Sequence, residues 1–197
     1  MPLENNHLEY EKLLQIFSSI YPLSDDLRNA IVENSDIVHA KRKTKLLSAG
    51  DRSNAIYFIV KGAARVYYLN NQGIETTTWL LLENELLISV YSFFAAQPSF
   101  EYIETIEDCT LISLRREMLD QLYQHYIEFN FIGRKLTEQY YIKNEAQANN
   151  LRMLNARQRY DQLLESNPEL ISRVPLGYIA SYLGITQATL SRVRKQK

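Results

Sequence analysis

A short stretch near the end of the sequence carries small polar and cationic side chains of the kinds that contact nucleic acids. The residues are Thr186, Gln187, Ala188, Thr189, Ser191, Arg192, Arg194 and Lys195. Amide and guanidinium groups form paired hydrogen bonds with the edges of bases, whereas hydroxyls and cations bind phosphate oxygens. We therefore predict that these residues form a DNA-binding surface.

No other group of residues has a pattern that predicts catalysis or a cofactor. The single cysteine, Cys109, excludes an internal disulfide and an iron–sulfur cluster, which needs several thiolates. The three histidines, His7, His39 and His125, do not have the spacing of a metal site. Phosphate-binding loops, dinucleotide-binding fingerprints and nucleophile motifs are missing from the sequence. We predict no enzyme, no catalytic residues, no metal and no cofactor.

The charge of the chain is divided between two parts. Residues 1–150 contain 14 basic and 20 acidic side chains, whereas residues 151–197 contain 8 basic and 3 acidic ones. A basic module on an acidic body is typical of a phosphate-binding part fused to a part that does not touch nucleic acid. Charge alone leaves a second interpretation open, in which the basic residues form an ordinary solvated helix face.

Residues 176–195 predict a helix-turn-helix that would position the polar residues named first. Gly184 supplies the positive φ angle that a tight turn requires, and Ala180 leaves room for the second helix to pack on the first. Thr186 can cap the second helix. The shared core is predicted to consist of Ile179, Leu183, Ile185, Leu190 and Val193.

The rest of the sequence predicts helices on both sides of a β-rich segment. Residues 9–34 have a helical pattern with a break at Pro22 and a capping residue at Ser24. Residues 36–114 contain short apolar runs separated by Gly- and Asn-containing turns, which favours a jelly roll. Residues 115–165 return to a helical pattern. We predict an α+β fold with an N-terminal double-stranded β-helix, a long helix and a C-terminal helix-turn-helix.

The long helix, predicted over residues 126–150, separates an effector domain (1–125) from a DNA-binding domain (151–197), with a small polar turn at residues 149–155. Two interpretations of its amphipathic face remain open. The face packs on the β-rich domain of its own chain, or it forms a parallel two-helix seam of a homodimer, in which polar positions set the register. We favour the seam, because a helix of this length extends beyond a small β domain. Its residues would be Ile132, Leu136, Tyr140, Lys143 and Ala146.

The order of these parts resembles the Crp/Fnr family of transcription regulators over nearly the whole chain. The stretch Leu46–Asp51 followed by the hairpin Tyr57–Arg65 is similar to the cyclic nucleotide-binding β-roll, and the long helix and residues 176–195 follow in the family's order. The resemblance implies a homodimer, paired through the long helix, that reads a two-fold symmetric operator in double-stranded DNA. RNA polymerase is a further partner that it implies.

The resemblance also places three residues of the second helix at positions that contact bases in the family. They are Gln187, Ala188 and Arg192, of which Gln187 suits adenine and Arg192 suits guanine. Because the sequence ends two residues after Lys195, we expect the β-hairpin wing found in some relatives to be reduced or absent, as in a shortened winged helix.

The family's ligand segment, which begins with a Gly-Glu pair and ends with Arg-Ser, corresponds here to residues 84–102. Asn84 replaces the glycine, Glu85 stands at the carboxylate position, and no arginine lies near Ser99. The 49 residues between Arg65 and Arg115 contain no Lys or Arg but seven carboxylates. A phosphate would lack a counter-charge there, so we expect no cyclic-nucleotide response by the family's usual mode. The candidate effector-pocket residues are Asn84, Glu85, Leu86, Ser99 and Phe100.

Aromatic residues around this segment have two interpretations, as ordinary core or as the lining of an apolar effector site. They are Trp79, Tyr91, Phe93, Phe94, Phe100 and Tyr102. The alternative to a DNA-binding regulator is accordingly a sensor or interaction module whose β-roll binds an unknown small apolar ligand and which has little DNA specificity. Cys109 lies in a predicted strand, where a small buried hydrophobe is its expected role.

No part of the sequence predicts contact with a membrane. No stretch approaches the roughly 18 consecutive apolar residues of a membrane span. Residues 1–10 lack the basic-then-apolar layout of a signal peptide. We therefore expect a cytoplasmic protein.

Overall fold

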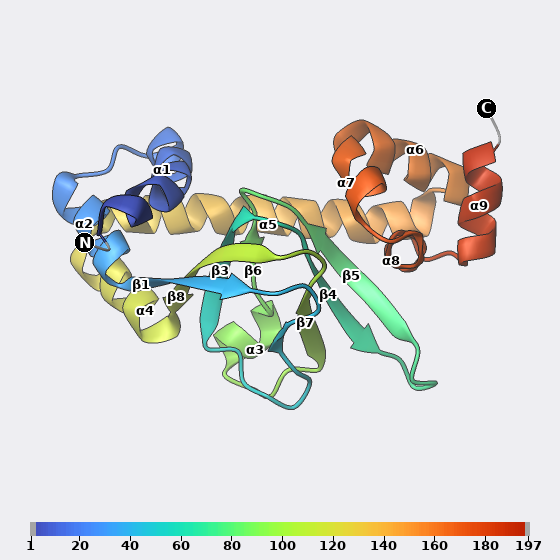
Figure 1. The fold of residues 1–197 in the computed structure, drawn as a ribbon, viewed down its shortest axis with the longest axis horizontal. Coiled ribbons are helices and arrows are strands. Elements are labelled where there is room, and N and C mark those ends of the chain that lie inside the picture. Colours follow the sequence, from blue (N-terminus) through green and yellow to red (C-terminus); the bar gives the residue numbers. More distant parts are fainter. Residues whose placement is uncertain (1–2, 196–197) are drawn as a thin grey trace.

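Two antiparallel four-stranded sheets form a β-roll in the computed structural model, which describes residues 3–195 (Figure 1). Their strand orders are β1-β8-β3-β6 and β2-β7-β4-β5. The core between them joins Ile59 and Leu111 of the first sheet to Val66 and Ile103 of the second, all fully buried. The strands are β1 (Ser35–Ala40), β2 (Lys45–Leu47), β3 (Ala55–Lys61), β4 (Ala64–Leu69), β5 (Glu75–Leu81), β6 (Leu86–Leu87), β7 (Glu101–Thr105) and β8 (Cys109–Arg115). The predicted double-stranded β-helix is confirmed.

A long helix, α5 (Ile127–Met153), runs past the β-roll and carries helices at both of its ends (Figure 1). The others are α1 (Leu3–Ile20), α2 (Asp25–Glu33), α3 (Val90–Ala95), α4 (Arg116–His125), α6 (Ala156–Ser166), α7 (Pro168–Arg173), α8 (Leu176–Tyr182) and α9 (Gln187–Lys195). Ser24 caps α2 as predicted, because its side chain accepts a hydrogen bond from the Leu27 N–H. Within residues 3–195, no helix is long and apolar enough to cross a membrane.

The break after α5 is shorter than the sequence indicated. The helix continues through most of the polar stretch at residues 149–155 and ends at Met153. Asn155 then starts α6 with a capping box, in which its side chain and that of Gln158 each accept a hydrogen bond from the other residue's backbone N–H. The hinge between α5 and the C-terminal helices therefore consists of Leu154 and Asn155.

The face of α5 that was predicted as a dimer seam packs on its own chain. Ile132 is fully buried among α1, α2 and α4, and Leu136 packs against the same cluster. The ring of Tyr140 lies 5.4 Å from that of Trp79 on β5, and Lys143 Nζ lies 3.1 Å from Glu85 Oε1. Ala146 is exposed and borders a cavity beside the β-roll. The first of the two interpretations holds for this face, because its apolar residues are used within the chain.

The opposite face of α5 is apolar at several exposed positions. Ile127 and Phe131 are exposed near the start of the helix, and Tyr141 and Ile142 are 67% and 66% exposed near its middle. Exposed apolar groups gathered along one helix face are typical of an interaction surface. If α5 pairs with a second copy, this outer face is the one left for it.

An apolar joint connects the C-terminal helices to the β-roll. Ala63, Leu80 and Ile106 of the β-roll belong to the same buried cluster as Leu170 of α7 and Ile179 of α8. The two parts therefore share a core, and the C-terminal helices are not attached by the hinge alone.

Polar contacts surround this joint on the side of α8. The Ser181 hydroxyl accepts a hydrogen bond from the Thr77 N–H at 2.9 Å and donates one to the Glu75 carbonyl at 3.1 Å, so that it lies on the edge of β5. The guanidinium of Arg65, which is 1% exposed, lies 3.7 Å from the ring of Tyr178. These contacts fix α8 along the second sheet.

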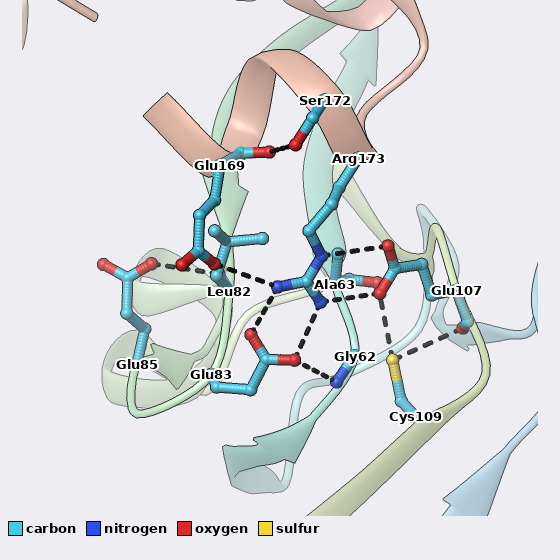
Figure 2. A network of polar contacts seen from close by, with 10 residues as sticks. All are labelled: Gly62, Ala63, Leu82, Glu83, Glu85, Glu107, Cys109, Glu169, Ser172 and Arg173. Carbon is cyan, nitrogen blue, oxygen red and sulfur yellow. Dashed lines mark hydrogen bonds and ion pairs between the residues drawn. The ribbon is translucent and has the colours of Figure 1, made fainter. Parts of the chain in front are cut away.

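On the side of α7, the joint is closed by Arg173 (Figure 2). Its Nη1 and Nη2 atoms each lie 2.7 Å from an oxygen of Glu83, while Nη2 and Nε lie 2.7 and 3.1 Å from the oxygens of Glu107. Glu83 also accepts a hydrogen bond from the Gly62 N–H at 2.8 Å. We call Arg173, Glu83 and Glu107 the Arg173 latch, since they join the C-terminal helices to two loops of the β-roll by bidentate ion pairs.

The latch makes the stability of the fold depend on pH through Glu83. The Arg173 guanidinium lowers the pKa of this carboxyl from its ordinary 4.5 to about 2. A lowered pKa stabilises the folded state above the ordinary value, and this contribution is lost as the pH falls through 4.5 toward 2. We expect Glu83→Gln to lower the free energy of unfolding by about 2 kcal/mol at pH 7 and to have little effect near pH 2.

Urea titrations of both proteins between pH 7 and pH 2 measure this difference. Glu117→Gln, which changes an exposed carboxylate of α4, should behave like the unchanged protein throughout. A Glu83→Gln effect that stayed constant over the whole pH range would contradict an ionised Glu83 in the latch.

Candidate nucleic-acid interface

Helices α8 and α9 form the helix-turn-helix that the sequence predicted. Gly184 takes a φ of 64° at the turn, where its N–H donates to the Ser181 carbonyl, and the Ile185 N–H donates to the Ala180 carbonyl. A left-handed residue ends α8 here at little steric cost because glycine has no Cβ. The predicted core residues Ile179, Leu183, Leu190 and Val193 are buried together with Ala180, and Ile185 is half-buried.

Thr186 starts α9 in the way expected of a cap. Its hydroxyl accepts a hydrogen bond from the Thr189 N–H at 3.1 Å and lies 3.0 Å from the Thr189 hydroxyl. Arg192 Nη2 donates to the same Thr189 hydroxyl at 3.2 Å. These contacts hold the Arg192 side chain along the helix and lower the conformational freedom that it would lose on binding.

The remaining side chains of the predicted DNA-binding set lie on the surface. Thr186 is exposed and Thr189 is half-buried, and Figure 1 shows α9 at the end of the molecule, beyond the end of α5. The exposed members on α9 are Gln187, Ala188, Ser191, Arg192, Arg194 and Lys195. The structure thus brings an amide, hydroxyls and three cations together on one accessible helix.

Three arginines of the basic C-terminal part have a structural role that the sequence did not reveal. Arg157 donates to the Val193 carbonyl at the end of α9 and pairs with Asp161 at 2.7 Å. Arg159 donates to the Leu183 and Leu154 carbonyls, and Arg173 belongs to the latch. These side chains are engaged within the chain, so fewer cations face outward than the net charge of this part indicates.

The predicted effector-pocket residues are occupied by contacts within the chain. Asn84 takes the left-handed conformation, with a φ of 69°, which asparagine tolerates in place of glycine. Glu85 accepts a hydrogen bond from the Leu82 N–H at 3.0 Å with one oxygen and pairs with Lys143 through the other. Leu86 is half-buried on β6. Glu85, which matches the carboxylate position of the family's ligand segment, therefore has both oxygens engaged.

At the other end of the segment, a carboxylate lies where a phosphate site would need a cation. Ser89, which precedes α3, donates to Glu101 Oε2 at 2.8 Å, and its hydroxyl lies 3.2 Å from that of Ser99. Burial raises the pKa of Glu101. Phe100 points outward and is 56% exposed. An anion bound beside Ser89 and Ser99 would meet the Glu101 carboxylate.

The aromatic residues of this region do not line one common site. Phe93 is buried in the core, whereas Tyr91, Phe94 and Phe100 are exposed. Trp79 packs on α5, and Tyr102 stacks on Tyr67 with ring centres 5.0 Å apart. Phe93, Trp79 and Tyr102 are thus used in packing within the chain, and Tyr91, Phe94 and Phe100 face outward.

A cavity of about 300 Å³ lies between the β-roll, α5 and the C-terminal helices. Its walls include Trp79, Tyr182 and Leu183, and its polar groups include the Glu85–Lys143 pair and Arg159. Of the predicted pocket residues, Glu85 alone lines it.

Neither a metal site nor a reactive cysteine is found in the described part of the chain. Residues 3–195 contain no group of three histidine, cysteine or carboxylate side chains that could hold a metal ion. Cys109 is buried as predicted, and burial raises the pKa of its thiol to about 11. A thiol with this pKa is protonated at neutral pH and therefore unreactive.

Comparisons with known proteins show that this chain shares its fold with Crp/Fnr regulators. Residues 37–126 match the family model of the cyclic nucleotide-binding domain. The c-di-GMP responsive global regulator CLP of Xanthomonas campestris is 17% identical, with 88% of this chain and 91% of that chain covered and a TM-score of 0.68. FixK2 of Bradyrhizobium japonicum is 20% identical, with coverages of 82% and 83% and a TM-score of 0.70.

A third solved structure carries the family name. It is a transcriptional regulator of the Crp/Fnr family from Eubacterium rectale, 17% identical, with coverages of 87% and 82% and a TM-score of 0.66. No curated protein matches this chain in sequence. The predicted resemblance to the Crp/Fnr regulators is confirmed at the level of the fold, and residues 37–126 match the model of the domain that these proteins share.

The contacts of residues 84–102 lead us to predict that the β-roll does not bind cyclic nucleotides. Because Glu85 is paired and Glu101 adds a carboxylate beside Ser89 and Ser99, titration with cyclic AMP or cyclic GMP should give no saturable heat up to about 1 mM in calorimetry. Glu101→Gln, which removes the negative charge, should not restore binding, because no cation is gained. A micromolar dissociation constant for either nucleotide would overturn this prediction.

Proposed function

We propose that this protein is a sequence-specific DNA-binding transcription regulator that acts as a homodimer on a two-fold symmetric operator. The observation that carries the proposal is the exposed polar face of α9 at the end of the molecule (Figure 1). A helix-turn-helix uses its second helix to read the major groove, and α9 has the length and side chains for this. The fold shared with Crp/Fnr regulators supports the same function.

Two side chains of α9 carry base recognition in this proposal. Gln187, in the first turn, can form two hydrogen bonds with adenine, and Arg192 can do the same with guanine. Arg194 and Lys195 follow and suit phosphates. Ala188, which is exposed between Gln187 and Arg192, offers its methyl group to a thymine methyl.

The homodimer in this proposal forms through the outer face of α5. Phe131, Tyr141 and Ile142 are exposed there, whereas the residues first predicted for the seam face their own β-roll. A helix of 27 residues is about 40 Å long, which is enough to hold two copies in parallel along several turns. Pairing along α5 would place both α9 helices at the same end of the dimer. A contact with RNA polymerase stays a prediction.

The cavity beside α5 favours a second candidate function, a sensor that binds a small apolar ligand. Its volume of about 300 Å³ is at the lower end of the range for ligand sites, and apolar groups such as Leu183 line it. Substitutions in α9 separate the two functions. They should abolish the sequence preference of a DNA-binding regulator, whereas ligand binding by a sensor without DNA specificity should not change.

Selection of genomic DNA fragments by the purified protein, without any added small molecule, tests the regulator. We expect a two-fold symmetric motif with half-sites about one helical turn apart. Gln187→Ala and Arg192→Ala should each weaken binding to that motif by about 10- to 100-fold and relax the preference at one base pair per half-site. The affinity of these variants for non-specific DNA should change little.

Matched controls for these variants are Gln72→Ala and Arg42→Ala, which change exposed side chains of the β-roll. Both should bind like the unchanged protein. Equal binding by the α9 variants and their controls would exclude base reading by this helix.

The dimer makes an independent prediction for α5. Replacing Tyr141 and Ile142 by glutamate would place four carboxylates across a parallel seam, because each helix contributes two. We expect the double variant to be monomeric at micromolar concentration in sedimentation equilibrium. The matched control is Leu69→Glu with Ile74→Glu in the β4–β5 hairpin, where the side chains are comparably exposed. A dimer that survives in the α5 variant would show that pairing uses another surface.

A further inference from the structure

The C-terminal domain is attached to the rest of the chain at two separate places. One is the hinge at Leu154 and Asn155, where the backbone passes from α5 to α6 and Arg159 of α6 donates to the Leu154 carbonyl. The other is the joint on the β-roll, which combines the shared apolar cluster, the Ser181 contacts on β5 and the Arg173 latch. A body held at two places has a defined orientation, whereas a hinge alone would leave it free to rotate.

The latch lies next to the DNA-reading unit in the chain. Arg173 ends α7, and only Val174 and Pro175 separate it from Leu176, the first residue of α8. Val174 is buried, and the proline ring holds φ at −54°, so this link is short and stiff. A movement of the end of α7 is therefore passed directly to α8 and, through their shared core, to α9.

The latch fixes both the position and the orientation of the Arg173 guanidinium. Glu83 and Glu107 each meet the planar guanidinium with two oxygens, and Figure 2 shows the guanidinium between them. Two bidentate pairs on one plane fix its tilt as well as its distance. The carboxylates come from the loop after β5 and the loop before β8, so the plane is fixed relative to both sheets.

We propose that Arg173 is a positioning residue for DNA binding, which, held by Glu83 and Glu107, sets the spacing between half-sites that the dimer accepts. The inference rests on the proposed function, since half-site spacing exists only for a dimer on a two-fold operator. One base pair advances the duplex by roughly 3.4 Å. Rejecting an operator with one base pair more or less requires each helix-turn-helix to be held more closely than that.

Loosening the latch should leave the domain folded. The Arg173 side chain is 24% exposed at the edge of the joint, and the buried cluster with Leu170 and Ile179 does not depend on its charge. Removing the carboxylates therefore releases the orientation of the domain while its own core persists. The effect is then visible in which operators are bound and not in whether the protein folds.

The experiment compares the unchanged protein with Glu83→Gln combined with Glu107→Gln on operators that share half-sites and differ in spacer length by one or two base pairs. We expect the unchanged protein to prefer one spacing by tenfold or more. The double variant should prefer it by less than threefold while keeping the same preference for half-site sequence. Arg173→Lys, which keeps the charge and loses the planar fork, should fall between the two.

The control is Glu33→Gln combined with Glu117→Gln, which removes two exposed carboxylates from α2 and α4. It is needed because any loss of negative charge strengthens binding to DNA at low salt. Thermal unfolding of every variant confirms that the domain is intact, and either single glutamine variant repeats the test with a smaller effect.

The outcomes separate the two proposals. A spacing preference that survives in the double variant, or disappears equally in the control, overturns the role of the latch. Failure of the unchanged protein to select any symmetric motif overturns the proposed function and with it this inference. Relaxed spacing with retained half-site preference, found in the double variant alone, supports both.

Discussion

The packing of α5 against its own β-roll is the constraint on which the rest of the structure depends. Ile132 anchors the start of the helix in the core formed with α1, α2 and α4, and Tyr140 and Lys143 hold its middle on β5 and the β5–β6 loop. Because this face is occupied, only the face with Tyr141 and Ile142 is available to a partner. The same packing sets the direction in which α5 runs past the β-roll.

A second constraint is the compensation of negative charge. The seven carboxylates between Arg65 and Arg115 have no cation among them, and buried carboxylates are costly unless they are paired. The structure gives each one a partner in the chain. The pairs are Glu75 and Glu104 with Arg65, Glu83 and Glu107 with Arg173, Glu85 with Lys143, Asp108 with Lys41, and Glu101 with the Ser89 hydroxyl. Six of the seven carboxylates are therefore balanced by a cation of the chain, and Glu101 accepts a hydrogen bond from a hydroxyl.

The sequence predicted those features that depend on neighbouring residues. The cap at Ser24, the turn at Gly184 and the core of the helix-turn-helix each follow from local conformational preference and spacing. It could not choose between the two faces of α5, because periodicity finds an apolar stripe without saying what covers it. Ion pairs such as Glu83 with Arg173, 90 residues apart, depend on the tertiary fold and have no local signal.

In residues 84–102, the carboxylate of the family's ligand segment is already engaged by contacts within the chain. A ligand shifts a protein between two arrangements only by binding one of them better. In this chain Glu85 is already bound by Lys143 of α5 and by the Leu82 N–H, so a ligand that used this carboxylate would first have to break an ion pair. In this structure, Lys143 already occupies the carboxylate that matches the family's ligand segment. The β-roll is thus connected to α5 and, through Arg173, to the helix-turn-helix by contacts that need no added molecule.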